Sequence, residues 1–572
     1  MPKDRIKLLI WLGLVIATLV LVLGVVVWLG RVVVFFGTGA DRGQALNVIP
    51  AVPADLAERV TWLPDHADAA TGRALDPVAR AQIAGGYLAA WAQLNVSHEL
   101  GAPYGLKTYF SGQALAQAEQ AVADVAAAGM PLRQSNLHHT LELTFFSDDG
   151  SIAAFTDHDA RFVRFLPDAA TVLETRAAYD VVMLLEDGNW RVRYFVRRGD
   201  GRDVASAAPV GENADATTAF ITTSGPYLWR DGARMPVAGV NYYPRATPWQ
   251  AFWREYDPAR TAADLQTVRT LGLNTVRIFV PFSDFGGGTV DPAMVAQLTD
   301  FLDQAQAHGI AVIVTLFDHR TDHSPANWAA DDRHIAGIVP ALAAHPALLA
   351  WDLKNEPDRD YDLNGVPLTQ AWLRHVAARV RAHDPNHLLT IGWSSPEAAV
   401  ALADAVDVVA YHYFAPAVAY SARVGALRDA VGPKPLLLEE FGLPTWNSIF
   451  PHGHTEAEQA AYYAEMLAQQ RALDTAGYLA WTLYDFVNMP WREFLLPWER
   501  GPQAHMGLIR RDDTLKPAAR LVAPDAALDA APVAAWRRFV KPFWLVLYAV
   551  AILGAGIVAF TRFFRRNSQG SE

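Results

Sequence analysis

Eight short apolar runs, each ending in polar residues, divide the second half of the chain into repeated units. They occupy 237–243, 275–282, 311–318, 348–356, 388–393, 408–414, 435–442 and 477–486. Helix-like stretches lie between most of them, such as 291–308 and 368–383. Strands that alternate with helices favour a parallel sheet covered by helices, and eight such units predict a (β/α)8 (TIM) barrel rather than an open doubly wound sheet.

Composition narrows the function classes. The chain has 572 residues, of which 52% are hydrophobic, so it can bury large cores. Its formal net charge of −12 argues against a nucleic-acid binder, which needs a basic face to neutralise phosphates. The chain has no cysteine, which excludes disulfides, thiolate catalysis and cysteine-ligated metals.

Both ends of the chain are apolar. Residues 8–30 carry no charge and are long enough to cross a bilayer, whereas the apolar core of a cleaved signal peptide spans only ~7–15 residues. Residues 543–561 form a second uncharged run. Lys3, Arg5 and Lys7 precede the first run and favour a cytoplasmic N-terminus. We therefore expect two transmembrane helices in the plasma (inner) membrane, cytoplasmic tails at 1–7 and 562–572, and an extracytoplasmic catalytic domain.

Between the apolar ends, the pattern predicts two domains. Residues 31–74 read as a spacer, and 75–200 run from two helices into alternating strands, which predicts a small α+β domain. Its final segment, "LLEDGNWRVRYF", resembles the last hairpin of NTF2-like domains, which are often accessory modules. A linker at 201–219 leads to the barrel at 220–525, and a second linker at 526–542 leads to the C-terminal apolar run.

The polar ends of the barrel strands carry the chemistry, because they meet at one face of a TIM barrel. Two carboxylates from well-separated strands, beside aromatic rings and a cation, are the apparatus of glycoside hydrolysis. The residues at these ends are Arg277, His319, Asn355, Glu356, His412, Tyr413, Glu440 and Trp481.

Residues 225–519 resemble the cellulase family of clan A glycoside hydrolases, which is glycoside hydrolase family five or a close relative. The resemblance rests on an ordered series of motifs at successive strand ends. These are "YLWRDGARMPVAGVNYY", "LGLNTVRIFVPF", "WDLKNEP", "LLLEEFG" and "GLIRRDDTLKPAA".

The resemblance implies a role for each site residue. Glu356 would be the general acid/base and Glu440 the nucleophile, held ionised by Arg277. Asn355 would donate to the 2-hydroxyl of the sugar. His412 and Trp481 would line the subsite of the cleaved sugar, and His319 lies where the family often has a histidine. Strand alternation is consistent with Glu440, since it would share a face with Leu436 and Leu438 while Glu439 would share the other with Leu437.

One motif departs from the family pattern. The family usually has His-x-Tyr on the sixth strand, whereas this chain has Phe414 at the tyrosine position and Tyr413 one residue earlier. Either a bulge turns Tyr413 inward to support the nucleophile, or that phenol is missing and Tyr413 is a packing residue.

Retention of anomeric configuration, which the family shows, gives two expectations. The carboxyl groups of Glu356 and Glu440 should stand ~5–5.5 Å apart. Glu356 should have a raised pKa so that it can donate a proton, and Glu440 a low one.

Three functional readings remain at this stage. The first is a membrane-anchored retaining hydrolase of an extracytoplasmic β-glucan or mannan, or a transglycosylase on the same scaffold. The second is a non-catalytic polysaccharide-binding or scaffold protein of an envelope assembly. In the third, the α+β domain carries the main function as a ligand-binding module.

The expected partners are the polysaccharide, the lipid bilayer through two spans, and proteins of envelope polysaccharide synthesis or export. We expect no cofactor and no metal. The cluster of Asp318, His319, Asp322 and His323 lacks the spacing of a strong metal motif.

Overall fold

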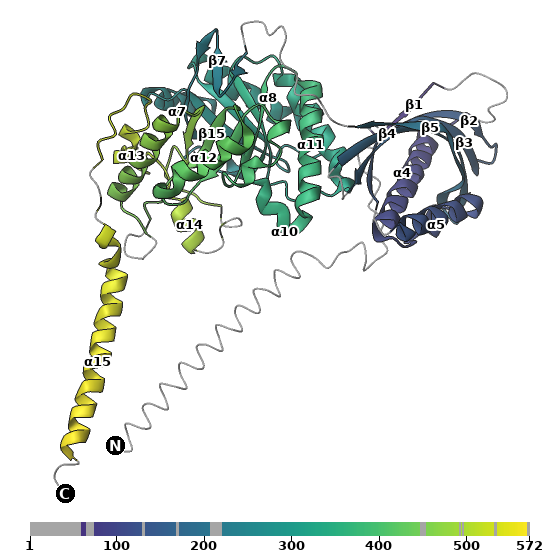
Figure 1. The fold of residues 1–572 in the computed structure, drawn as a ribbon. Helices are drawn as coiled ribbons and strands as arrows, with labels where there is room; N and C mark the ends of the chain where they lie inside the picture. The colour runs from purple at the N-terminus through teal and green to yellow at the C-terminus, as the bar shows by residue number, and fades with distance from the viewer. Residues whose placement is uncertain are drawn as a thin grey trace. The chain divides into compact units, whose positions relative to one another are not determined.

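A computed structural model describes residues 59–64, 74–128, 132–166, 171–205, 220–446, 453–490, 494, 497–530, 533 and 535–568. The chain separates into two compact units, which are described in turn (Figure 1).

The N-terminal unit combines two helices with a five-stranded sheet in the order β1-β2-β3-β4-β5. Figure 1 shows the long strands curving beside the helices. The elements are β1 (Val60–Trp62), α4 (Pro77–Leu100), α5 (Gly112–Ala127), β2 (Arg133–Phe146), β3 (Ile152–Leu166), β4 (Thr171–Glu186) and β5 (Asn189–Ala205). The predicted order of helices followed by strands is what the structure has. The NTF2-like resemblance stays a prediction.

A buried polar network crosses the core of this unit. Asp157 accepts a hydrogen bond from the Tyr87 hydroxyl at 3.0 Å and contacts His139 Nδ1 at 2.6 Å, and all three residues are fully buried. The Asp157 carboxylate thus finds its hydrogen-bond partners within its own domain, as a buried polar group requires.

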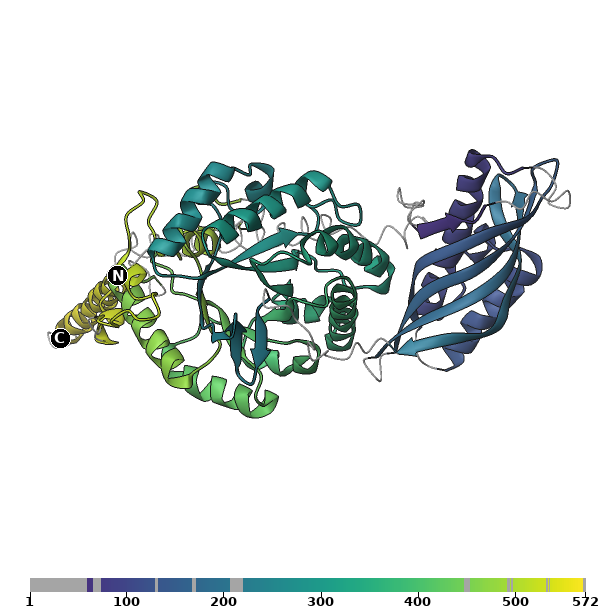
Figure 2. The ribbon, with the colours of Figure 1, turned by 90° about the horizontal axis from the view of Figure 1, so that it is seen from above.

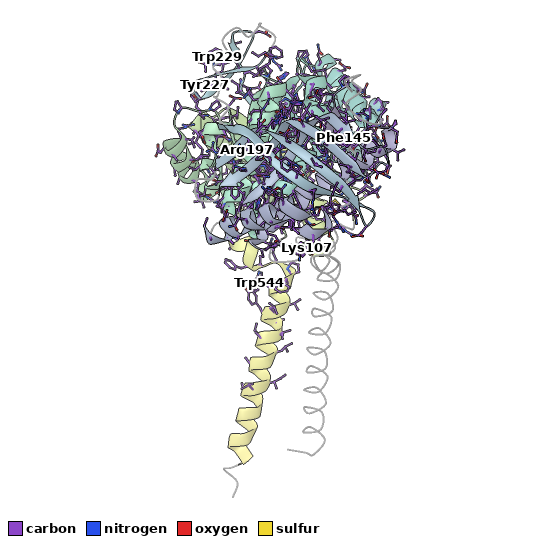
Figure 3. The ribbon with its side chains drawn as sticks, turned by 90° about the vertical axis from the view of Figure 1, so that its right-hand side faces the viewer. Lys107, Phe145, Arg197, Tyr227, Trp229 and Trp544 are labelled. Carbon is purple, nitrogen blue, oxygen red and sulfur yellow. The ribbon has the colours of Figure 1, made fainter. Side chains whose placement is uncertain are left out.

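The other face of the sheet is the one that Figure 3 turns to the viewer, with Phe145 and Arg197 labelled on it.

The second unit is a closed barrel of eight parallel strands, which confirms the predicted barrel (Figure 2). All eight predicted runs are strands. They are β9 (Val237–Asn241), β10 (Thr275–Pro281), β11 (Ala311–Asp318), β12 (Leu348–Asn355), β13 (Leu388–Trp393), β14 (Val409–Tyr413), β15 (Leu436–Phe441) and β16 (Gly477–Ala480).

Helices surround the strands, as Figure 2 shows from above. The larger ones are α7 (Pro258–Thr270), α8 (Pro292–Ala307), α9 (Trp328–Leu342), α11 (Val366–His383), α12 (Tyr420–Val431) and α13 (Glu456–Leu473). Two of them begin with an Asp-Pro pair. Asp257 before α7 and Asp291 before α8 accept hydrogen bonds from backbone N–H groups of the first turn, and the following proline needs no such partner.

One end of the barrel is filled by an apolar cluster. Residues from seven of the eight strands meet there, so the cluster lies inside the ring: Val237, Ile313, Ala350, Leu388, Ala410, Leu437 and Leu479 are among them. A small three-stranded antiparallel sheet precedes β9 and comprises β6 (Thr222–Ser224), β7 (Tyr227–Arg230) and β8 (Ala233–Arg234). Ile221, just before β6, and Leu228 of β7 join the cluster, and Figure 3 labels Tyr227 and Trp229 on the same sheet.

Leu437 and Glu439 share one face of β15, as the alternation predicts, and that face is the inner one. Glu440 also reaches the barrel interior, because the pairing register shifts beside it: between Tyr411 and His412 on β14, and between Leu438 and Phe441 toward β16. Such irregularities re-aim a side chain, and here they bring two adjacent glutamates to one site.

A long apolar helix, α15 (Pro542–Ser568), ends the described chain, and Figure 3 labels Trp544 in its first turn. Its segment Pro542–Ala559 is long and apolar enough to cross a membrane, and none of that window is buried in protein. The predicted N-terminal span, 8–30, lies outside the described residues.

We expect Ile313→Ala to destabilise the barrel by ~2–5 kcal/mol, because it opens a cavity in the apolar cluster that fills one end of the barrel. Denaturant unfolding of the purified full-length chain measures this. Val418→Ala, at a side chain that is 83% exposed, is the control and should stay within ~0.5 kcal/mol of the parent. Equal stability of the two variants would contradict the packing described.

Candidate active site

Arg277 of β10 links the polar ends of four strands. Its guanidinium is fully buried and donates to Asp352 Oδ2 at 2.6 Å, to Glu440 Oε1 at 2.5 Å and to Asn355 Oδ1 at 2.9 Å. It also donates to Asn241 Oδ1 on β9 at 3.1 Å. A planar cation with five N–H groups suits this task, because it can satisfy several acceptors in fixed directions.

Asp352 anchors the guanidinium from β12. Its Oδ2 also accepts from the Thr315 hydroxyl at 2.6 Å, and its Oδ1 accepts from the backbone N–H of Gly392 at 2.9 Å. Both oxygens are therefore paired in the dry interior, which makes this carboxylate a structural partner of Arg277.

The two glutamates of β15 have different surroundings. Glu440 is hydrogen-bonded to Arg277 and is 5% exposed, so it reaches the open side of the barrel. Glu439 is fully buried, and neither of its oxygens has a hydrogen-bond partner among the described residues. Arg277 Nε lies 3.6 Å from Glu439 Oε1, and His412 Nε2 lies 3.8 Å from Glu439 Oε2.

His412 of β14 lies between the candidate catalytic carboxylates. Its Nδ1 is 3.1 Å from Glu356 Oε1 and 3.6 Å from Glu440 Oε2. Glu356 Oε1 and Glu440 Oε2 can therefore be no farther apart than the sum of these two distances. The candidate acid/base and the candidate nucleophile are therefore neighbours across one imidazole edge.

Glu356 follows β12 in a left-handed backbone conformation, with φ of 46°. Residues other than glycine adopt this conformation rarely, and it occurs preferentially at functional sites. Oε2 of this glutamate contacts Arg359 Nε at 2.8 Å. The two Glu356 oxygens thus face two different cations, His412 and Arg359.

A family model confirms the chemistry to which this geometry points. Residues 232–486 match the model described as "Cellulase (glycosyl hydrolase family 5)". The chain contains a cellulase-type glycoside hydrolase domain. This domain includes every strand of the barrel and all eight site residues predicted from the sequence.

Proteins named as mannosidases are similar to this chain. Mannan endo-1,4-beta-mannosidase 1 of Oryza sativa subsp. japonica is 27% identical over 343 residues, which cover 45% of this chain and 78% of that enzyme. Mannan endo-1,4-beta-mannosidase A of Aspergillus aculeatus is 26% identical over 225 residues, or 33% of this chain and 58% of that enzyme. The solved exo-beta-1,4-mannosidase Op5Man5 from Opitutaceae bacterium strain TAV5 aligns at 22% identity with a TM-score of 0.44, covering 53% of this chain and 61% of that one.

An aromatic wall borders the hydrolase site. Trp481, just after β16, packs edge-on against Tyr243, Phe279 and Trp249 at centroid distances of 6.0 to 6.5 Å. The Trp481 indole N–H donates to Gln503 Oε1 at 3.1 Å, which fixes the orientation of the ring. Phe279 also lies over the Arg277 guanidinium, so the wall continues into the charged cluster.

Tyr413 does not support the nucleophile. Its hydroxyl donates to the carbonyl of Pro416 at 2.8 Å, and its ring packs edge-on against Tyr420. The register shift that the sequence left open occurs just before His412 and brings His412, rather than Tyr413, opposite Glu440. Tyr413 is thus a buried packing residue.

His319 follows β11 at the barrel rim, also with a left-handed backbone. Its Nε2 lies 3.3 Å from Asp318 Oδ2, and its side chain is 43% exposed. No contact in the described structure joins it to Glu356 or Glu440. The described residues contain no group of three or more His, Asp or Glu side chains placed to hold a metal ion.

The pKa shifts of Glu356 and Glu440 run opposite to the prediction. The pKa of Glu356 lies below its usual range: burial would raise it, but the hydrogen bond and charge of His412 and the charges of Arg359 and Arg277 outweigh burial. Burial raises the pKa of Glu440, against the lowering charges of His412 and Arg277. The sequence-based expectation had Glu356 high and Glu440 low.

His412 explains much of this reversal. Burial would lower its pKa, but the charge of Glu440 and the contacts with Glu356 and Glu439 raise it to about 10. The imidazole is therefore a cation near neutral pH, and it holds Glu356 ionised in the free site. The general-acid role predicted for Glu356 needs the opposite, protonated state.

Sequence reasoning missed Asp352, Asn241 and Arg359. The sequence does contain a sign of the role of Asp352, because an acidic residue in the middle of an apolar strand needs a buried partner. Asn241 had a weaker one, as a polar residue at the end of the first strand. Arg359 had none, because it follows the strand and meets Glu356 only through the local turn.

We expect Gly392→Ala to damage this cluster. A methyl group there would lie 2.7 Å from Glu439 Oε2 and 2.8 Å from Arg277 Nη2, so we predict a loss of ~1–3 kcal/mol in stability, together with loss of glycosidase activity. Thermal unfolding of the full-length protein measures the first effect. The control is Gly425→Ala in helix α12, which meets nothing within 4 Å and should be neutral or stabilising. A Gly392→Ala protein as stable and active as the parent would contradict the described packing.

Proposed function

We propose that this protein is a membrane-anchored, retaining β-glycoside hydrolase that cleaves an extracytoplasmic β-linked polysaccharide, a mannan or a β-glucan. Glu440 attacks the anomeric carbon while Glu356 protonates the leaving oxygen. Water, deprotonated by Glu356, then attacks the anomeric carbon of the glycosyl-enzyme, breaks its bond to Glu440 and frees the sugar.

One observation carries this proposal: Glu356, which follows β12, and Glu440 of β15 come from separate strands and contact the same imidazole nitrogen at 3.1 and 3.6 Å. Such proximity favours direct attack, because inverting enzymes keep their carboxyl groups ~6.5–9.5 Å apart to admit a water.

The surroundings favour Glu440 over Glu439 as the nucleophile. Glu440 is partly exposed and held by Arg277 Nη1, whereas Glu439 has no exposed surface. Asn355 accepts from Arg277 through Oδ1, which leaves its amide N–H groups to donate to the sugar 2-hydroxyl. Trp481, oriented by Gln503, would stack on the face of the same sugar.

Relatives named as mannan endo-1,4-beta-mannosidases make β-1,4-mannan the first substrate to test. Transglycosylation on the same scaffold would use another sugar in place of water. The non-catalytic scaffold reading is disfavoured by the intact pair of carboxylates and by their shared contacts with His412 and Arg277.

Membrane anchoring rests on the two apolar ends. In α15, Trp544 stacks near Tyr548 in the first turns, where an aromatic belt would meet a membrane interface. Large apolar side chains such as Ile552 and Leu553 are more than 60% exposed along the helix, with no protein surface covering them. The proposal for the first span, at 8–30, rests on its sequence alone.

We expect Glu356→Gln to lower turnover by ~10²–10⁴-fold without unfolding the protein, because the amide keeps the shape but cannot transfer the proton. Glu440→Gln should abolish turnover. Both are assayed on mannan, xylan and β-1,4-, β-1,3- and β-1,6-glucans, with proton NMR reporting the anomer first released.

Glu397→Gln, at an exposed glutamate paired with Arg423, is the matched control and should retain activity. Release of the inverted anomer would contradict the retaining mechanism. A folded parent protein with no activity on any polymer would favour the scaffold reading.

Anchoring predicts that the full-length protein stays in the membrane pellet after washing at alkaline pH with carbonate. Apolar spans of this length are held by the hydrophobic effect, which such a wash does not weaken. Recovery of the mature protein from the culture medium, cleaved near Gly30, would exclude an anchored enzyme.

A further inference from the structure

The ion pair between Arg359 and Glu356 conflicts with the acid role of Glu356. Arg359 Nε lies 2.8 Å from Glu356 Oε2, and a donor on that oxygen favours the ionised carboxylate. The acid must carry a proton when the glycosidic bond breaks. The guanidinium therefore has to leave Oε2 in the productive complex.

Arg359 is free to take another partner. Its side chain is 67% exposed, and the contact with Glu356 uses Nε, which leaves the terminal amino groups that bind carboxylates in a fork. The acidic residues on either side of it are occupied: Asp358 accepts from Ser394, and Asp360 pairs with Lys354.

The two oxygens of Glu356 place Arg359 relative to the reaction. Oε1 faces His412, which also contacts Glu440, so this side holds the sugar that is attacked. Oε2 faces Arg359, on the other side of the acid. Arg359 thus lies beside the sugar that departs with the leaving oxygen.

We propose that Arg359 selects substrates whose leaving-group sugar carries a carboxylate, such as a uronic acid. That carboxylate takes the guanidinium from Glu356, and Glu356 then takes up from solvent the proton that it donates to the leaving oxygen. This inference rests on the proposed hydrolase function and names its substrate class. A neutral sugar offers no charge to draw Arg359 away, so neutral polymers are cleaved more slowly.

The charged groups around Glu356 give the proposal a pH signature. His412 from β14, Arg277 from β10 and Arg359 hold it ionised, while Glu440 from β15 opposes them. Removing only the Arg359 charge raises the pKa of Glu356. The alkaline limb of kcat/KM on a neutral polymer should then move to higher pH in Arg359→Gln.

The test uses full-length protein with β-1,4-mannan and β-1,4-glucan, each untreated and with a fraction of its C6 hydroxyls oxidised to carboxylates. Mass spectrometry then locates the acidic sugars in the products. Cleavage turns the leaving-group sugar into the new non-reducing end. We expect the parent to prefer the oxidised polymer about fivefold, the upper end for an exposed ion pair, and to enrich acidic sugars at those ends.

Arg359→Gln should lose both the preference and the enrichment, and should gain activity on the untreated polymer at alkaline pH. Arg374→Gln, which removes another exposed pair, with Asp404, is the control and should match the parent. A parent protein without preference or enrichment, or an Arg359→Gln protein that keeps them, overturns the proposal while leaving the hydrolase intact. If no polymer is cleaved and Glu440→Gln changes nothing, the hydrolase assignment itself fails.

Discussion

The buried guanidinium of Arg277 is the constraint on which the active site depends. An arginine with no exposed surface is stable only when its charge and N–H groups are matched, and three other strands supply the partners. Matching them fixes the position of Asp352, Asn355 and Glu440 at once. The barrel therefore positions the proposed nucleophile, Glu440, through one cation that is outnumbered by the carboxylates around it.

That surplus of carboxylates has a mechanistic consequence. Burial would lower the pKa of His412, but Glu440, Glu356 and Glu439 raise it to about 10, and His412 in turn lowers the pKa of Glu356. The proposed acid role of Glu356 needs the protonated carboxyl group and therefore a change in its contacts. The exposed Arg359 is the partner most easily displaced.

The sequence predicted the barrel, the contact of Arg277 with Glu440, and that Asn355, Glu356 and His412 lie at the same face, because polar residues at the ends of parallel strands must meet. It failed where the register shifts. A simple alternation kept Glu440 off the face that Leu437 and Glu439 share, whereas the register shifts beside Glu440 bring its side chain to the same interior. The predicted order of the two pKa values failed for another reason: a pKa depends on burial and on every neighbour, and the burial of Glu440 and the contact of Arg359 with Glu356 were not foreseen.

The most direct test of the account is to trap the glycosyl-enzyme. A 2-deoxy-2-fluoro β-mannoside or β-glucoside with a good leaving group should form a glycosyl-enzyme on the full-length protein. That intermediate should hydrolyse slowly enough to be located by peptide mass spectrometry. The account predicts a covalent sugar on Glu440. A label on Glu439, or turnover of the same compounds with no covalent intermediate on either glutamate, would contradict it.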